Sequence, residues 1–76
     1  MWIKAVDELG KRRDVYASSY KEGESGFFFY NDKEFVAYFF GPRIVEGKRG
    51  YVKYENKLYP CTLIGVIHED SHNTVS

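Results

Sequence analysis

Residues 26–41 read GFFFYNDKEFVAYFFG, two aromatic runs on either side of a short polar break. Aromatic and β-branched side chains favour extended strands. Asn31 and Asp32 stand in the break, and both residue types tolerate the backbone conformations of tight turns. This stretch therefore predicts a β-hairpin.

A second stretch, residues 50–65, reads GYVKYENKLYPCTLIG and aligns with the first without gaps, 24 positions later. Four equivalent positions are identical: Gly26 and Gly50, Tyr30 and Tyr54, Lys33 and Lys57, and Gly41 and Gly65. Glu55 and Asn56 occupy the polar break, so a second hairpin is predicted. Pro60 has no N–H to donate, which indicates an edge strand or a position that faces solvent.

Two further strands are predicted at residues 2–8 and 13–19, joined around Gly10, which adopts a positive φ in a turn at little cost. The predicted fold is all-β, with about five or six antiparallel strands in a small barrel or curled sheet of SH3-like size. Residues 50–66 resemble the strand, tight turn and aromatic return strand of Tudor-like and other SH3-like barrels. That resemblance implies a small barrel.

A helical interpretation competes over residues 32–40. Phe35, Val36, Phe39 and Phe40 fall on one helical face, and Gly41 followed by Pro42 is a stop signal. Asn31 and Glu34 have the spacing of a capping box. The alternative fold is therefore α+β with a short helix near residues 32–40, and residues 1–9 are also compatible with a short helix.

The chain has 76 residues, of which 43% are hydrophobic, as expected for one folded domain. We predict a β-rich domain over residues 1–68 and a polar, frayed tail over residues 69–76. Eleven Lys and Arg residues balance eleven Asp and Glu residues. Zero net charge argues against a general binder of nucleic acid or of anionic membranes, which carries a basic excess.

The sequence predicts a cytoplasmic protein with no membrane partner. It contains no apolar run of about 18 residues that would form a transmembrane helix. No signal-peptide core follows Met1. Cys61 is the one cysteine of the chain, which excludes an internal disulfide and fits a reducing compartment.

No group of residues points to catalysis or to a metal. His68 and His72 are four residues apart in a polar segment, but no third ligand stands at a useful spacing. Cys61 has no base beside it in the sequence and is expected to be a buried structural thiol. The serines and glycines form neither a nucleophile elbow nor a phosphate-binding loop. We therefore predict no catalytic residue, no metal site, no cofactor and a protein that is not an enzyme.

The register of the hairpins decides which side chains share a face, because directly opposed residues point the same way. With a two-residue turn, Val52 opposes Tyr59 and Gly50 opposes Cys61, so the second hairpin has one apolar and one mixed face. The first hairpin is apolar on both faces, one with Phe28, Phe35, Ala37 and Phe39, the other with Phe27, Phe29, Val36, Tyr38 and Phe40. A turn one residue longer would swap these faces and leave both apolar.

A hairpin that is apolar on both faces needs more cover than this short chain supplies. Exposed apolar patches mark interfaces, and aromatic residues anchor them. We therefore predict a small protein-binding module that acts as an adaptor, regulator or inhibitor of a larger protein. The predicted contact residues are Phe27, Phe29, Tyr38 and Phe40, and the partner is another protein or a second copy in a homodimer. The alternative, that both faces are core, stays open.

A second function is suggested by basic residues that alternate with aromatic ones after residue 42. Arg43, Lys48, Arg49 and Lys53, together with Tyr51, have the composition of grooves that bind single-stranded nucleic acid. The alternative prediction is thus a nucleic-acid-binding small β-barrel. A solvated face with charges that protect edge strands would have the same composition.

Overall fold

The structure, a computed structural model, describes residues 1–68. Its strands are β1 (Trp2–Asp7), β2 (Val15–Tyr16), β3 (Ser19–Glu22), β4 (Gly26–Asn31), β5 (Glu34–Phe40), β6 (Arg49–Tyr54) and β7 (Lys57–Ile67). The predicted all-β class is confirmed. The helical alternatives are wrong, because β5 covers residues 34–40 and β1 covers most of residues 1–9. The polar tail at residues 69–76, including His72, lies outside the described residues.

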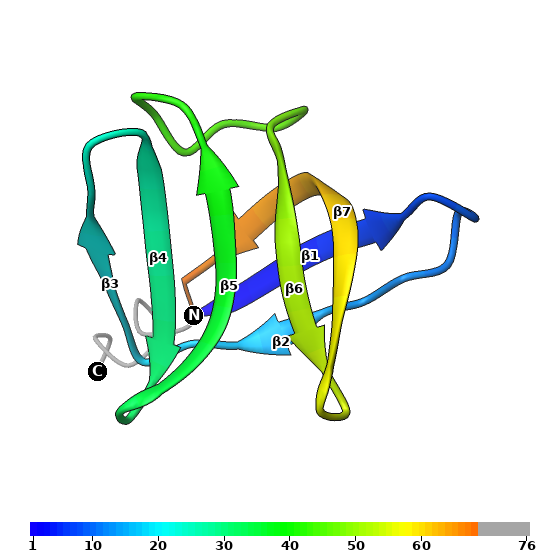
Figure 1. Cartoon of the computed structure of the whole chain (residues 1–76), viewed down its shortest axis with the longest axis horizontal. Helices are drawn as coiled ribbons and strands as arrows, with labels where there is room; N and C mark the ends of the chain where they lie inside the picture. Colours follow the sequence, from blue (N-terminus) through cyan, green and yellow to red (C-terminus); the bar gives the residue numbers. More distant parts are fainter. Residues whose placement is uncertain (69–76) are drawn as a thin grey trace, which may run out of the picture.

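All seven strands described form one antiparallel sheet in the order β2-β1-β7-β6-β5-β4-β3. The long strand β7 pairs with β6 through its first half and with β1 through its second half. Figure 1 shows β7 curving between these two partners, so that the sheet folds over on itself. The fold is therefore a curled sheet, the second of the two predicted architectures.

The two edges of the curled sheet are linked by Ala17 and Ser18, which connect β2 to β3. Ala17 exchanges hydrogen bonds with Met1, from Ala17 N to Met1 O over 2.9 Å and from Met1 N to Ala17 O over 2.8 Å. Ser18 N donates to Tyr30 O at the end of β4 over 2.8 Å. The predicted strand at residues 13–19 is split here because the chain leaves β1 and crosses to β4.

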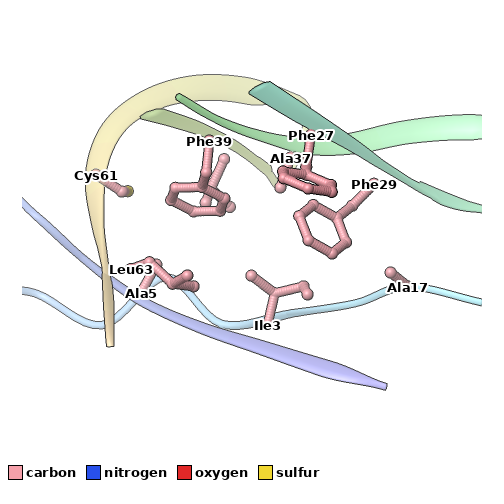
Figure 2. Packing of buried hydrophobic residues seen from close by; sticks show 10 residues of the cluster. Ile3, Ala5, Ala17, Phe27, Phe29, Ala37, Phe39, Cys61 and Leu63 are labelled. Atoms are coloured by element: carbon pink, nitrogen blue, oxygen red, sulfur yellow. The ribbon is translucent and has the colours of Figure 1, made fainter. Parts of the chain in front are cut away.

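The core lies on the concave side of the sheet. Figure 2 shows the rings of Phe29 and Phe39 between the two halves of the sheet, facing Ile3 and Leu63. The buried set consists of Ile3, Ala5, Ala17, Phe27, Phe29, Ala37, Phe39, Val52, Cys61 and Leu63. No polar or charged residue is buried among residues 1–68, so hydrophobic burial is the main source of stability in this part of the chain.

The predicted register of the second hairpin is confirmed. Val52 opposes Tyr59, and Gly50 opposes Cys61. The turn residues Glu55 and Asn56 have φ angles of 51° and 67°. Two positive φ angles in a two-residue loop are typical of a type I′ turn, whose twist matches that of the flanking strands.

The predicted faces of the first hairpin are wrong, because β5 contains a bulge. Tyr30 opposes Phe35, but Phe29 opposes Ala37, so Val36 is an extra residue on β5. One extra residue shifts the following side chains to the other face of the sheet. Phe27 and Phe29 consequently lie in the core, and they do not share a face with Tyr38 and Phe40 as predicted.

Candidate protein-binding face

The convex side of the sheet carries four aromatic rings in contact, which we call the outer strip: Phe28, Tyr38, Phe40 and Tyr51. The ring centroids of Phe28 and Tyr38 are 4.5 Å apart. Those of Tyr38 and Phe40 are 4.9 Å apart, and those of Phe40 and Tyr51 are 6.4 Å apart. The contacts make one continuous aromatic surface across β4, β5 and β6.

The strand register explains why these rings meet. Tyr38 opposes Phe28 on one side and Tyr51 on the other. Tyr51 in turn opposes Pro60 of β7, and Lys21 of β3 opposes Phe28. Directly opposed residues project from the same face. One row of five side chains therefore crosses five neighbouring strands, with three aromatic rings at its centre.

The connection from β3 to β4 shapes one end of the outer strip. A Cβ atom added to Gly26 would lie 2.6 Å from Tyr38 Oη, so the tyrosine ring lies where a side chain would otherwise stand. A Cβ atom added to Gly23 would lie 2.9 Å from Phe28 Cε1. Ser25 Oγ and Tyr38 Oη are 2.9 Å apart and form a hydrogen bond. These contacts hold the Phe28 and Tyr38 rings in place.

The other end of the outer strip is open to solvent. Phe40 is 47% exposed and Tyr51 is 39% exposed. Leu58, on the same face of β7, is 58% exposed. Single exposed apolar residues are normal on protein surfaces, whereas a contiguous group is informative.

A shallow groove of about 460 Å³ runs beside this exposed end. Phe40, Tyr51 and Pro60 form its apolar wall, and Glu8 and Arg49 add charged groups. The groove thus combines an apolar wall with both signs of charge.

The residues of the nucleic-acid prediction are partly brought together. Arg49, Tyr51 and Lys53 alternate along β6 and therefore share the convex face with the outer strip. Lys53 Nζ binds Glu34 Oε2 at 3.1 Å. Lys48 packs against Gly41, because a Cβ atom there would lie 2.9 Å from Lys48 Nζ. Arg43 lies in the exposed connection between β5 and β6.

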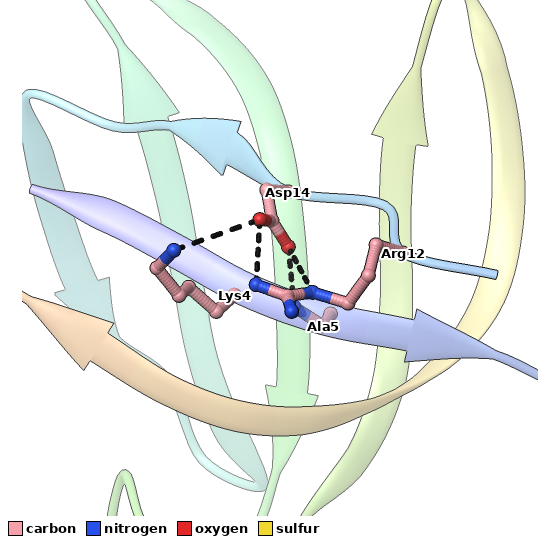
Figure 3. A network of polar contacts seen from close by, with 4 residues as sticks. All are labelled: Lys4, Ala5, Arg12 and Asp14. Atoms are coloured by element: carbon pink, nitrogen blue, oxygen red, sulfur yellow. Dashed lines mark hydrogen bonds and ion pairs between the residues drawn. The ribbon is translucent and has the colours of Figure 1, made fainter. Parts of the chain in front are cut away.

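The charged side chains of β1 and of the connection that follows it mostly contact one another. Asp14 accepts hydrogen bonds from Arg12 Nη2 at 2.8 Å and from the backbone N–H of Ala5 at 3.2 Å (Figure 3). Lys4 Nζ lies 3.8 Å from the same carboxylate. These contacts fasten the connection between β1 and β2 to β1, which is a structural role.

Arg13 lies between a carboxylate and two aromatic rings. Its Nε donates to Asp7 Oδ2 at 3.0 Å, and its guanidinium carbon lies 3.9 Å from the ring centre of Tyr59 and 5.2 Å from that of Tyr54. A guanidinium over an aromatic face is attracted by the ring quadrupole. The arrangement covers the tip of the β6–β7 hairpin on the concave side.

Cys61 is buried, as predicted, and its surroundings also affect the ionisation of its thiol. Burial, with a smaller effect of the Asp7 charge, raises the pKa of the Cys61 thiol to about 11. The thiolate is the nucleophilic and metal-binding form, so little of it exists at neutral pH. In the described part of the chain, no three His, Cys, Asp or Glu residues are grouped to hold a metal ion.

A second groove, of about 430 Å³, lies at the other side of the curled sheet. Its apolar lining comes from Tyr20, Val45, Ile64 and Val66, and Phe29 of the core forms part of its wall. This groove could not be predicted from the sequence, because its lining comes from five separate segments of the chain. Nothing in its surroundings indicates what would occupy it.

Comparison with known proteins identifies no relative. No protein-family model matches the chain, and neither a curated protein nor a solved structure matches it. Residues 1–68 contain no helix long and apolar enough to cross a membrane.

Proposed function

We propose that this protein is a small non-enzymatic binding module that contacts another protein through the outer strip. One observation carries the proposal: Phe40 and Tyr51 form the exposed end of an aromatic surface on a sheet whose concave side already holds the core. Exposed apolar groups of this kind mark interaction surfaces, and aromatic side chains supply most of the anchoring energy there. An adaptor, regulator or inhibitor of a larger protein would work in this way.

The contact residues proposed from the structure differ in part from those predicted from the sequence. Tyr38 and Phe40 remain, whereas Phe28 and Tyr51 replace Phe27 and Phe29. The exposure of Phe40 and Tyr51 makes them the strongest anchors, because their burial against a partner removes the most apolar area from water. We further propose a cytoplasmic location, in which the unpaired thiol of Cys61 stays reduced.

The test is selection from a phage library of random dodecapeptides on the immobilised protein. Peptides that bind should lose most of their signal on the double variant Phe40→Ser with Tyr51→Ser. Leu9→Ser removes a side chain that is 91% exposed in the connection after β1 and should retain binding. Circular dichroism melting curves should show that both variants fold.

Two results would contradict the proposal. One is a selection that yields no peptide dependent on Phe40 and Tyr51. The other is unfolding of both Phe40→Ser and Tyr51→Ser as single variants, which would make these rings part of the structure rather than of an interface. A second copy of the chain as partner is tested by analytical ultracentrifugation, in which the double variant should sediment as a monomer if wild type is a dimer.

A nucleic-acid-binding function is the second candidate, because Arg49, Tyr51 and Lys53 share the face of the outer strip. Binding through phosphate contacts weakens steeply with salt. A fluorescent oligo(dT) that binds at low salt and is released by moderate salt would support it. Unchanged anisotropy of that oligonucleotide at low salt would exclude it.

A further inference from the structure

The ion pairs of the described residues are unevenly distributed. Asp7 and Asp14, with their partners Arg13, Arg12 and Lys4, belong to β1 or to the connection that follows it. On the convex face of β4–β7, the one ion pair within residues 1–68 joins Lys53 to Glu34. Lys21, Lys48 and Arg49 make no ion pair within those residues.

Two of these cations, Lys21 and Arg49, lie on the face of the outer strip. Lys21 opposes Phe28 at the β3 end of the row. Arg49 lines the groove together with Phe40 and Tyr51. Lys48 packs on Gly41, the residue after Phe40. The aromatic surface is thus bordered by positive charge at both ends.

Carboxylates contribute less to this face. Glu34 is neutralised by Lys53, and Asp7 is held by Arg13 and by the backbone N–H groups of Lys11 and Leu9. Glu8, which also lines the groove, and Glu24, in the connection before β4, are exposed. Among the described residues, the strands β3–β7 thus place two unpaired cations, Lys21 and Arg49, on the convex face and no unpaired carboxylate, which suits a short anionic segment.

We infer that the outer strip receives a short acidic segment of a partner protein, bound in an extended conformation. This inference rests on the proposed function. Apolar side chains of the segment pack on Phe40 and Tyr51, and its carboxylates lie near Arg49 and Lys21. With strands about 4.8 Å apart, the three spacings from β3 to β6 amount to roughly 14 Å, which about five extended residues cover.

Ring orientation favours a peptide over single-stranded nucleic acid. Successive bases stack on exposed ring faces along a continuous basic groove. Here the Tyr38 and Phe40 rings are inclined at 84°, and the Phe40 and Tyr51 rings at 66°. Neighbouring rings therefore cannot both offer a face to consecutive bases, whereas the varied side chains of a peptide fit edges and faces alike.

The test uses the same peptide library and measures the charge of the peptides that bind. Peptides selected on wild type should be enriched in Asp and Glu relative to the unselected library. A synthetic copy of the most enriched peptide should bind Arg49→Glu at least about tenfold more weakly than wild type, and binding should weaken as sodium chloride is raised. Lys57→Glu is the matched control, since Lys57 opposes Tyr54 on the concave side and is exposed.

The outcomes separate the inference from the proposed function. Peptides that depend on Phe40 and Tyr51 but are neutral or basic would overturn the inference and leave the proposed function standing. No peptide dependent on these rings would overturn both. If oligo(dT) displaces the selected peptide and binds more tightly than the peptide does, the partner is nucleic acid and the inference is wrong. Equal weakening by Arg49→Glu and Lys57→Glu would also contradict it.

Discussion

Phe28 of β4 lies directly opposite Tyr38 of β5, and their ring centroids are 4.5 Å apart on the convex face of the sheet. This relationship exists because Val36 is an extra residue on β5. Without the bulge, Phe28 would oppose Ala37 and point into the core. The bulge thus decides which aromatic side chains stabilise the fold and which are available to a partner.

Neighbouring phenylalanines on β4 allow a direct test of this assignment. Phe29 is fully buried, so Phe29→Ala should destabilise the protein by about 3–5 kcal/mol. Phe28 lies on the outer strip, and Phe28→Ala should cost about 1 kcal/mol, the value of a surface aromatic contact. Urea denaturation of the two variants measures both. A larger loss for Phe28→Ala than for Phe29→Ala would mean that β5 pairs without the bulge.

The sequence predicted the hairpins and the register of the second one, because Glu55 and Asn56 mark its turn and its apolar residues alternate cleanly. The first hairpin could not be resolved in the same way. Its two possible registers both give aromatic faces, so the hydrophobic pattern does not distinguish them, and nothing about Val36 marks it as a bulge. The sequence predicts that Tyr38 and Phe40 share a face, as they do, but it places Phe28 on the other face.

The distribution of charge on the convex face could not be predicted from the sequence either. Lys21 is separated from Arg49 by the whole first hairpin and the connection that follows it, and only the strand order brings both to the convex face. The predicted basic cluster contained Arg49 and Lys53 but could not show that Glu34 neutralises Lys53. Which charges remain unpaired depends on contacts between strands, and these follow from the register.

Gly26 should be intolerant of a side chain. An added Cβ atom would collide with the carbonyl oxygen of Phe39 and would lie 2.6 Å from Tyr38 Oη. Gly26→Ala must therefore displace β5 or the Tyr38 ring, and we expect a loss of about 1–3 kcal/mol in the free energy of unfolding. Gly65→Ala is the control, because no atom lies within 4 Å of its added Cβ. Chemical denaturation that gives equal effects at both positions would contradict the close packing at Gly26.

The turn between β6 and β7 leaves room for stabilisation. Glu55 and Asn56 both have positive φ. This backbone conformation is unfavourable for a residue that carries a side chain. Asn followed by Gly is the preferred pair for a type I′ turn. Glu55→Asn with Asn56→Gly should therefore stabilise the protein by about 1 kcal/mol and raise Tm by roughly 4–8 °C. Lys33→Gly is the control, because it introduces glycine at a turn position without a positive φ, and it should lower Tm. A rise in Tm similar to that of the double variant would show that relief of the positive φ angles is not the cause.

Stability should fall in acid because two carboxylates have lowered pKa values in the folded protein. The backbone N–H of Lys11, with Arg13 and against the opposing effect of burial, holds the pKa of Asp7 below its usual value. Burial raises the pKa of Asp14, but hydrogen bonds from Arg12 and Ala5 outweigh it, and the net shift is downward. A carboxylate with a lowered folded-state pKa stabilises the protein above its unfolded-state pKa, about 3.9, and this contribution is lost as the pH falls below it.

Asp14→Asn tests this dependence. The variant should be less stable than wild type at pH 7, because Arg12 and Lys4 lose their partner. Its stability should decline less steeply between pH 5 and pH 2, because one of the two titrating groups is gone. Asp32→Asn is the control, because Asp32 lies in the exposed turn of the first hairpin and makes no ion pair within residues 1–68. Urea denaturation at each pH measures the slope, and parallel curves for wild type and Asp14→Asn would show that the Asp14 contacts in Figure 3 do not stabilise the fold.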